Sequence, residues 1–354
     1  MNILITGGAG FVGSSLGILI KKQYPNYEVI AMDNLMRRGS ELNLVRLKKA
    51  RIRFVHGDIR NTEDFQQIDK KIDLIIEASA EPSVLAGLNN SPEYVINTNL
   101  VGTINCLNFA QKQKADFIFL STSRVYPIAQ VEEIKFVEDD TRFAISSTQH
   151  LSGISKKGIS EKFPLDGYRS FYGASKLAAE LMIHEFNQFY GIKTVINRCG
   201  VLTGPWQMGK VDQGVIVLWV ARHFWKNKLA YFGYGGEGKQ VRDILHVEDL
   251  WKLIDFQVHN IDKVNGEILN VGGGSEISVS LMELTDICRT VTNNEIPIQK
   301  VSETRQADIR IYITDNSKVT DLTGWTPNIA PDDIVREIHS WIKSNQESLI
   351  DILN

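Results

Sequence analysis

The stretch Ile3-Leu4-Ile5-Thr6-Gly7-Gly8-Ala9-Gly10-Phe11-Val12-Gly13 decides the fold of this chain. An apolar strand pattern ends at Thr6, and the glycines that follow have the spacing GxxGxxG. Glycine permits a tight turn and lets the backbone approach a pyrophosphate closely. The helix that begins next offers unpaired N–H groups and a positive dipole to that anion. Placed directly after a first strand, the motif predicts a dinucleotide-binding loop rather than a structural Gly-rich turn.

Strand and helix patterns alternate beyond this loop. We expect strands at residues 3–6, 28–33, 53–58, 73–79, 116–122 and 194–198, and helices at residues 11–24, about 94–114 and 172–190. Short apolar strands that alternate with helices predict a parallel sheet covered on both faces. Residues 127–170 break this pattern and lack clear periodicity, and a loop of that length is usually functional or disordered.

Asp33 ends the second expected strand, about 20 residues after the glycines. A carboxylate at that position binds the ribose hydroxyls of NAD and repels the 2′-phosphate of NADP. Arg37 and Arg38 favour NADP, since they could reach such a phosphate, but they lie beyond the strand tip. The sequence therefore predicts NAD as the cofactor. Asp58-Ile59, after the third strand, is expected at the adenine edge, and a plain strand-end turn is the alternative.

Tyr172-Gly173-Ala174-Ser175-Lys176 opens a predicted helix, and the spacing places Tyr172 and Lys176 on one helical face. The pKa of a free tyrosine is about 10, too high for a base at neutral pH. A nearby ammonium favours the phenolate, so Tyr172 can accept a proton from a hydroxyl whose carbon loses hydride. Thr122 closes the fifth strand, and strand carboxyl ends are where doubly wound sheets bind ligands. An ordinary strand hydroxyl is the alternative for Thr122.

The bulk composition excludes several classes of protein. The chain has 354 residues, a hydrophobic fraction of 43% and a formal net charge of −3, so we expect neither a nucleic-acid nor a membrane partner. Its three cysteines are far apart, and no Cys or His spacing suggests a metal site. No signal-peptide pattern is evident at the N-terminus, which makes a cytoplasmic protein the default expectation.

These motifs together resemble the extended short-chain dehydrogenase/reductases that epimerise or dehydrate nucleotide sugars. Asn99-Leu100-Val101-Gly102-Thr103 resembles the family's NVxGT segment, and Gly324-Trp325-Thr326-Pro327 its GWxP element. The resemblance implies an α/β fold, a Rossmann-type doubly wound parallel sheet with a smaller C-terminal substrate-binding lobe. We expect an NAD-binding domain at residues 1–198, which later strands may join, and a nucleotide-sugar-binding lobe at residues 199–354.

The family also assigns roles to residues of this chain. It implies Thr122, Tyr172 and Lys176 as the catalytic residues. Cofactor contacts are expected from Gly7, Gly10, Phe11, Val12, Gly13, Asp33, Asn34, Asp58, Ile59, Ala78, Asn99, Tyr172 and Lys176. Substrate contacts are expected from Glu81, Ser123, Asn197, Gln213, Arg242 and Arg305.

A narrower resemblance points to one subfamily. Asp212-Gln213-Gly214 and residues 238–246, read Gly-Lys-Gln-Val-Arg-Asp-Ile-Leu-His, are similar to the CDP-paratose (CDP-tyvelose) 2-epimerases, as is the insertion before Tyr172. The resemblance implies diphosphate contacts for Arg242 and Arg305, because a guanidinium donates in a planar fork that suits phosphate. An ion pair is the alternative for Arg242. The implied reaction is NAD-dependent epimerisation at C2 of a CDP-hexose.

One segment departs from the family pattern. Related enzymes often carry His or Gln after the fourth strand, whereas Glu77-Ala78-Ser79-Ala80-Glu81 stands here. Two carboxylates near a diphosphate would be unfavourable unless they turn away, although Glu81 is able to hold sugar hydroxyls.

Three other functions compete with a 2-epimerase. A 4-epimerase would use the same residues on another carbon. A 4,6-dehydratase would carry Asp-Glu after the catalytic Thr, where Ser123-Arg124 stands here. The intact Tyr172/Lys176 pair disfavours a non-catalytic dinucleotide sensor. Resembling enzymes often pair through the helix of Tyr172, so we expect a homodimer or homotetramer built on Leu177, Leu181, Met182 and Phe186, with burial within one chain as the alternative.

Overall fold

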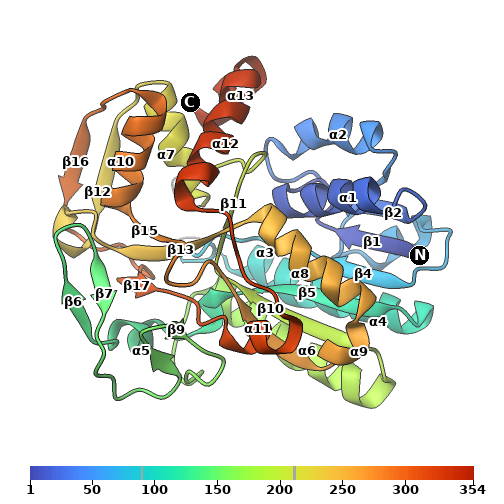
Figure 1. Cartoon of the computed structure of the whole chain (residues 1–354). Helices are drawn as coiled ribbons and strands as arrows, with labels where there is room; N and C mark the ends of the chain where they lie inside the picture. The colour runs from blue at the N-terminus through green and yellow to red at the C-terminus, as the bar shows by residue number, and fades with distance from the viewer. Residues whose placement is uncertain (89–90, 210–212) are drawn as a thin grey trace. The chain divides into compact units, whose positions relative to one another are not determined.

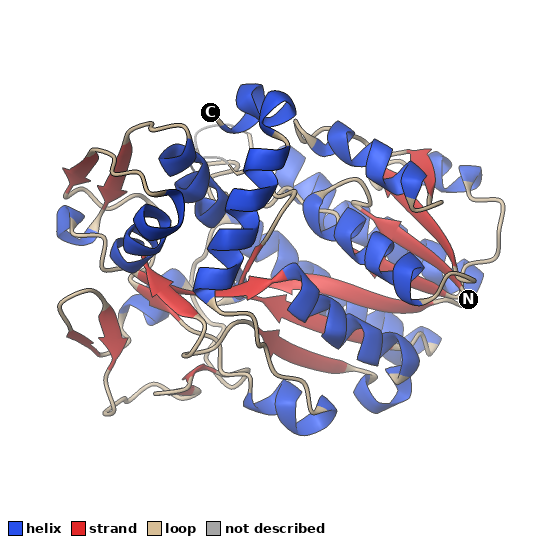
Figure 2. Cartoon of the chain, turned by 45° about the horizontal axis from the view of Figure 1, so that its top comes forward, coloured by secondary structure: helices blue, strands red, loops and turns tan. Residues whose placement is uncertain are grey.

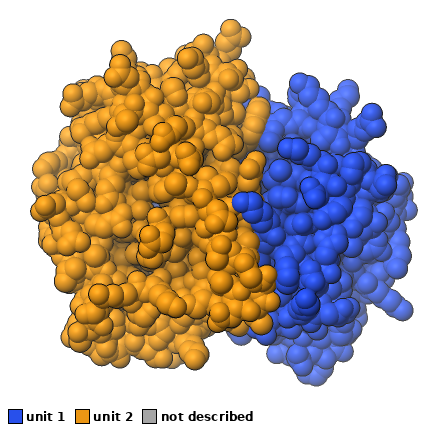
Figure 3. All heavy atoms as spheres, viewed as in Figure 1, with its two compact units in different colours: residues 1–125, 170–198, 251–269 blue, residues 126–169, 199–250, 270–354 orange. Residues whose placement is uncertain are grey.

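The computed structural model describes residues 1–88, 91–209 and 213–354. They form two compact units, which Figure 3 colours separately. Unit 1 comprises residues 1–125, 170–198 and 251–269, and unit 2 comprises residues 126–169, 199–250 and 270–354. The chain passes between the units several times, so residue 198 marks only one of these crossings. Residues 126–169, which we expected within the cofactor domain, belong to unit 2, and residues 251–269 return to unit 1.

A seven-stranded sheet forms the centre of the cofactor-binding fold (Figure 1). Its order is β3-β2-β1-β4-β5-β10-β14, and the pairs among β1 to β5 are parallel. The strands are β1 (Asn2–Thr6), β2 (Glu28–Asp33), β3 (Arg53–His56), β4 (Leu74–Glu77), β5 (Asp116–Thr122), β10 (Thr194–Cys199) and β14 (Glu267–Val271). The order reverses between β1 and β4, which is the switch point where such sheets bind ligands. The predicted doubly wound α/β fold is confirmed, including a strand from beyond residue 198.

Helices cover both faces of this sheet (Figure 2). On one face α1 (Phe11–Gln23) packs against β1 and β2, followed by α2 (Asn43–Lys49). On the other face α4 (Gly102–Gln113) and α6 (Phe171–Tyr190) pack against β4 and β5. Side chains alternate between the faces, so Leu4, Ile75 and Phe117 join the core under α4 and α6.

The predicted helix at residues 94–114 has three parts. It consists of α3 (Glu93–Ile96), a π-helical turn η3 (Asn97–Val101) and α4. A π-turn inserts a residue into the helical ladder and is frequent at functional sites. The spacing of apolar residues in this segment did not reveal the π-helical turn. One inserted residue turns the apolar face around the helix axis but leaves it recognisable.

The helix α6 has clear local start and stop signals. The hydroxyl of Ser170 accepts the N–H of Gly173 and so caps the first turn. Gly191 ends the helix with a φ of 67°, a left-handed conformation that glycine adopts without steric cost. The predicted start at Tyr172 was therefore one residue late.

Unit 2 contains smaller sheets and a helical layer. Its largest sheet joins β11 (Val201–Thr203), β13 (Val241–His246), β15 (Ser278–Ser280) and β17 (Ile311–Tyr312), and a parallel pair joins β12 (Leu229–Phe232) to β16 (Ile298–Val301). The helices α7 (Val215–Phe224), α10 (Leu281–Thr292) and α12 (Pro331–Ser344) pack on one another, and α13 (Gln346–Leu353) packs against α7 and α12. Of the other helices, α11 (Ser317–Thr323) belongs to unit 2, whereas most of α8 (Val247–His259) and all of α9 (Ile261–Val264) belong to unit 1.

Residues 127–170 are not an unstructured loop. They contain α5 (Ile128–Glu132) and two antiparallel hairpins, β6 (Phe136–Glu138) with β7 (Phe143–Ile145) and β8 (Ile154–Ser155) with β9 (Gly158–Ile159). Strands of two or three residues are too short to show an alternating pattern, which is why the sequence did not reveal them. Among the described residues no helix combines the length and apolar character needed to cross a bilayer.

Candidate active site

The glycine loop lies at the switch point of the sheet. Gly7 has a φ of +66°, and a Cβ there would lie 2.7 Å from the carbonyl oxygen of Ala78, which follows β4. A Cβ on Gly13 would lie 2.2 Å from the carbonyl oxygen of Gly7. Both positions therefore require glycine. The backbone N–H of Gly8 donates to Met32 at 3.0 Å, which holds the loop against β2.

The first turn of α1 suits an anion. Gly10 is its N-cap and supplies no side-chain hydrogen bond, and the turn contains no acidic residue. Phe11 and Val12 lie half-buried in this turn. The N–H groups of an uncapped helix start and its dipole favour negative charge, so this loop fits the pyrophosphate of a dinucleotide.

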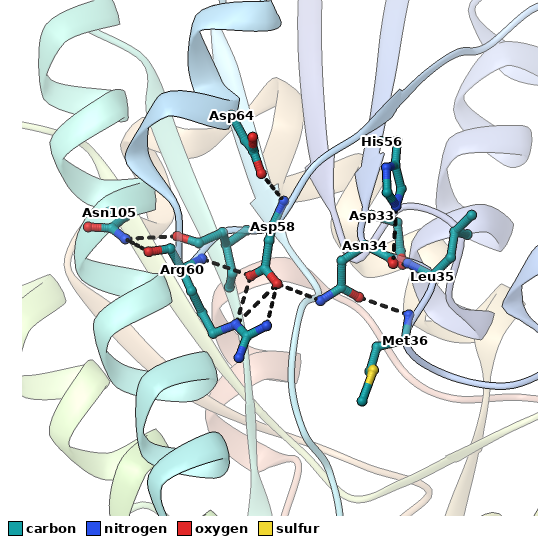
Figure 4. A network of polar contacts seen from close by, with 10 residues as sticks. Asp33, Asn34, Leu35, Met36, His56, Asp58, Arg60, Asp64 and Asn105 are labelled. Carbon is teal, nitrogen blue, oxygen red and sulfur yellow. Dashed lines mark hydrogen bonds and ion pairs between the residues drawn. The ribbon is translucent and has the colours of Figure 1, made fainter.

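Asp33, which is labelled in Figure 4, is the last residue of β2 and connects this strand to the glycine loop. One carboxylate oxygen accepts the N–H of Ala9 at 3.0 Å and the other accepts the N–H of Leu35 at 2.8 Å. Burial raises the pKa of Asp33, and these backbone donors oppose that rise. Each carboxylate oxygen has a second lone pair. Asp33 can therefore order the loop and still accept a hydrogen bond from a ribose hydroxyl.

Asn34 and Asp58 form a second polar cluster beside Asp33 (Figure 4). The amide of Asn34 donates to Asp58 at 2.9 Å, and the guanidinium of Arg60 donates to both oxygens of Asp58. Burial alone would raise the pKa of Asp58, but the bonds from Arg60 and Asn34 outweigh it and lower the pKa to about 2. Ile59 is buried, in contact with the helix start at Gly102. The structure thus brings the expected adenosine-side residues together at the ends of β2 and β3.

The three predicted catalytic residues lie on neighbouring elements of unit 1. Thr122 is the last residue of β5 and is buried, and α6, which carries Tyr172 and Lys176, packs against β5. Tyr172 is half-buried in the first turn of α6, whereas Lys176, one turn later, is 1% exposed. The ammonium of Lys176 lies 3.7 Å from the centroid of the Phe119 ring. A cation over an aromatic face is attracted to it, and the attraction grows when water is excluded.

Asn99, an expected cofactor ligand, links two parts of unit 1. It lies on the π-turn and is wholly buried. Its amide oxygen accepts the N–H of Glu81 at 2.8 Å, and its amide nitrogen donates to the carbonyl of Glu81 and the hydroxyl of Ser175. The cofactor contact expected of Asn99 stays a prediction, and in the structure this side chain has a linking role. It ties the loop after β4 to the Tyr-Lys helix.

A buried ion pair that the sequence analysis missed anchors the same helix. Glu180 lies one turn after Lys176, and its carboxylate accepts two bonds at 3.1 Å and one at 2.7 Å from Arg198 on β10. The hydroxyl of Ser121 on β5 also donates to Glu180. Glu180 and Arg198 are both among the buried residues. A charged residue on the buried face of α6 is the only sequence signal that could have revealed this pair.

The substrate candidates of unit 1 differ in accessibility. Glu81 is half-buried, and its carboxylate accepts the N–H of Ser83 at 3.0 Å. Ser123 is half-buried and begins the short 3-10 turn after β5. Asn197 is wholly buried, and its amide exchanges two hydrogen bonds with Gln257 on α8 at 2.9 and 2.8 Å. The substrate contact expected of Asn197 stays a prediction.

The remaining substrate candidates lie in unit 2. The guanidinium of Arg242 donates to Asp308 at 2.9 Å and to the carbonyls of Ile309 and Arg310, so the ion-pair alternative describes what this side chain does. Arg305 stacks over the ring of Phe232 at 3.8 Å. Gln213 is half-buried just before α7, whereas Asp212 of the same segment lies outside the described residues.

The comparisons with known proteins agree on one family. The family model described as the NAD dependent epimerase/dehydratase family matches residues 3–272. The chain is 31% identical to a protein of Salmonella typhi named CDP-paratose 2-epimerase, over 97% of this chain and 100% of that protein. It is 30% identical to a putative UDP-glucose 4-epimerase of Methanocaldococcus jannaschii, over 98% of this chain and 100% of that protein.

The solved structures give the same result. The dTDP-glucose 4,6-dehydratase DesIV of Streptomyces venezuelae, crystallised with NAD bound, superposes with a TM-score of 0.80 at 26% identity. The match covers 99% of this chain and 100% of that one.

Proposed function

This chain belongs to the NAD-dependent epimerase/dehydratase family, and from that premise we propose that it inverts carbon 2 of a CDP-linked hexose through a bound keto sugar. The similarity to CDP-paratose 2-epimerase along the whole of both chains carries this proposal. The segments at residues 213–214 and 238–246 support it, because they are the ones similar to that subfamily. The sugar pair is CDP-paratose with CDP-tyvelose, or CDP-glucose with CDP-mannose.

NAD is the cofactor of the family, and the glycine loop with Asp33 is the part of this chain that fits it. The uncapped start of α1 would hold the pyrophosphate, and Asp33 the adenosine ribose. When bound, NAD supplies reversible hydride transfer at the sugar carbon. An epimerisation involves no net oxidation or reduction of the sugar, so the cofactor is expected to stay with the protein between turnovers.

The proton of the reacting hydroxyl is moved by Tyr172. Its phenolate accepts this proton as the sugar carbon is oxidised and returns it when the carbon is reduced from the other side. The buried ammonium of Lys176, one turn along the same face, favours the phenolate form. Thr122, at the end of β5, donates or accepts a hydrogen bond at the same hydroxyl.

Two other reactions of the family remain distinct alternatives. A 4-epimerase would use the same three residues, and the similarity to a putative UDP-glucose 4-epimerase favours testing it second. A 4,6-dehydratase is disfavoured because Ser123 and Arg124 stand where such enzymes place Asp-Glu.

The test is proton NMR of CDP-paratose and CDP-glucose, incubated separately with the purified protein and without added NAD. Appearance of the C2 epimer in either tube, and its absence with a Tyr172→Phe variant, is the expected result. If neither sugar changes while NAD is found bound, the CDP-sugar assignment fails, and the UDP and GDP sugars are the next substrates to test.

We also propose that two copies of the chain associate through α6. Leu181 is 61% exposed on that helix, while Phe186 packs into the core under α6 and Met182 packs against it. Leu177 is half-buried. Of the four residues expected at an interface, Leu181 is therefore the one that a partner would cover. The three cysteines are buried free thiols, which supports a reducing compartment such as the cytoplasm.

A further inference from the structure

Glu77 is a buried carboxyl that the reaction scheme above does not use. It is the last residue of β4 and has no exposed surface. One oxygen accepts the hydroxyl of Thr103 on α4 at 2.7 Å. The other oxygen has no hydrogen-bond partner among the described residues. A buried carboxylate oxygen without a partner is costly unless a positive charge lies near it.

The nearby positive charge belongs to Lys176. Glu77 is the register partner of Phe119 across β4 and β5, so the two side chains leave the same face of the sheet. The ammonium of Lys176 lies over the ring of Phe119 at 3.7 Å and is itself almost fully buried. Cation and carboxyl therefore share one water-excluded space between the sheet and α6.

We infer that Glu77 is the counterion of Lys176: its carboxylate keeps the ammonium charged and held over Phe119, and so sets the pH range in which Tyr172 exchanges its proton. Glu77 is thus a positioning residue, which acts through Lys176. The part of the inference that concerns Tyr172 rests on the proposed function, whereas the pairing of Glu77 with Lys176 does not.

The groups around Glu77 leave few other charges to consider. Lys176 faces it from α6, Thr103 and Cys106 from α4, and Phe119 from β5. Burial raises the pKa of the Cys106 thiol well above its usual value, and that thiol therefore stays neutral. The charge of this space is consequently governed by Glu77 and Lys176.

The pKa of Glu77 agrees with this arrangement. Burial raises it to about 7, and the ammonium of Lys176 and the hydroxyl of Thr103 limit the rise. Removing the charge of Glu77 should lower the pKa of Lys176 and of Tyr172 together, because a neighbouring negative charge raises the pKa of both groups.

The first test compares the pH dependence of kcat/KM for the wild type, Glu77→Gln and Glu77→Asp. The Gln variant keeps the shape of the side chain without its charge, and both limbs of its profile should move to lower pH by about one unit. The Asp variant keeps the charge, and its limbs should stay closer to those of the wild type. A Gln variant with lower kcat and unmoved limbs would overturn the inference.

The second test needs no substrate. Melting temperatures are measured for Glu77→Gln, Lys176→Met and the double variant, with retained NAD removed from all samples. Each single change leaves one buried partner unbalanced, so the double variant should lose less than the sum of the two single losses. Additive losses would overturn the pairing. Because this result is independent of activity, a failed CDP-sugar assay and a failed pairing are distinguishable.

Discussion

Replacing Arg198, which anchors the Tyr-Lys helix, should lower the melting temperature more than the replacement of any surface charge. The variant Arg198→Met leaves the carboxylate of Glu180 buried without its ion-pair partner, since the side chains of Arg198 and Glu180 are 3% and 1% exposed. Breaking a buried pair from one side costs about 3–5 kcal/mol. Unfolding entropy is about 2.1 cal/mol/K per residue, or roughly 0.7 kcal/mol/K for this chain. The melting temperature should therefore fall by about 4–7 °C.

Differential scanning calorimetry of three variants decides the matter. The matched control is Arg336→Met, which removes a surface ion pair to Asp332 whose partners are 57% and 53% exposed. That change should lower the melting temperature by about 1 °C or less, because exposed pairs contribute about 0–1 kcal/mol. The double variant Glu180→Leu/Arg198→Met should recover most of the loss. Equal shifts for Arg198→Met and Arg336→Met would refute the reasoning.

Three further changes have defined outcomes. The pKa of Glu77 is about 7 in the fold against 4.5 for a free side chain, so the native state binds more protons than the unfolded state. The free energy of unfolding should therefore fall as pH rises from 4.5 through 7, by at most about 3 kcal/mol. Urea unfolding at pH 5 and pH 8 should show this fall in the wild type but not in Glu77→Gln. Asp33→Ala should weaken NAD binding by about 10- to 100-fold in a calorimetric titration of the cofactor-free protein, and unchanged affinity would remove Asp33 from the ribose site. Leu181→Glu should convert a dimer to a monomer in analytical ultracentrifugation, whereas Val45→Glu, at a site 60% exposed on α2, should not; a dimer that survives Leu181→Glu argues for another interface.

The sequence was sufficient for the central sheet because strands buried on both faces are short apolar runs. β2 and β5 begin and end where they were expected, and β1 and β10 each differ by one residue. The strands expected at residues 53–58 and 73–79 end two residues early, at His56 and Glu77, because their polar ends turn into the ligand edge. The small hairpins of residues 127–170 were missed, since so few residues cannot show a period.

The candidate site could be predicted where its residues lie close together in the sequence. The glycine spacing and the Tyr172–Lys176 spacing each lie within one turn or loop, and the structure places both at the ligand edge of the sheet. The hydrogen bonds of Asn99 and Asn197 were not predicted, because a motif names a residue without showing which neighbour its amide will bond. Only the fold reveals that Glu81 and Gln257 take those bonds.

Two buried carboxylates that face α6, Glu180 and Glu77, differ in how completely their oxygens are hydrogen-bonded, and this difference separates anchoring from tuning. Glu180 accepts three bonds from Arg198 and one from Ser121, so this pair holds the helix in place. Glu77 accepts one hydrogen bond, from the hydroxyl of Thr103, and its other oxygen has no hydrogen-bond partner in the part of the chain that the structure describes. Burial raises the pKa of Glu77 to about 7, and the ammonium of Lys176 and the hydroxyl of Thr103 oppose this rise. The residue that departs from the family pattern is therefore also the one that we propose as the counterion of Lys176.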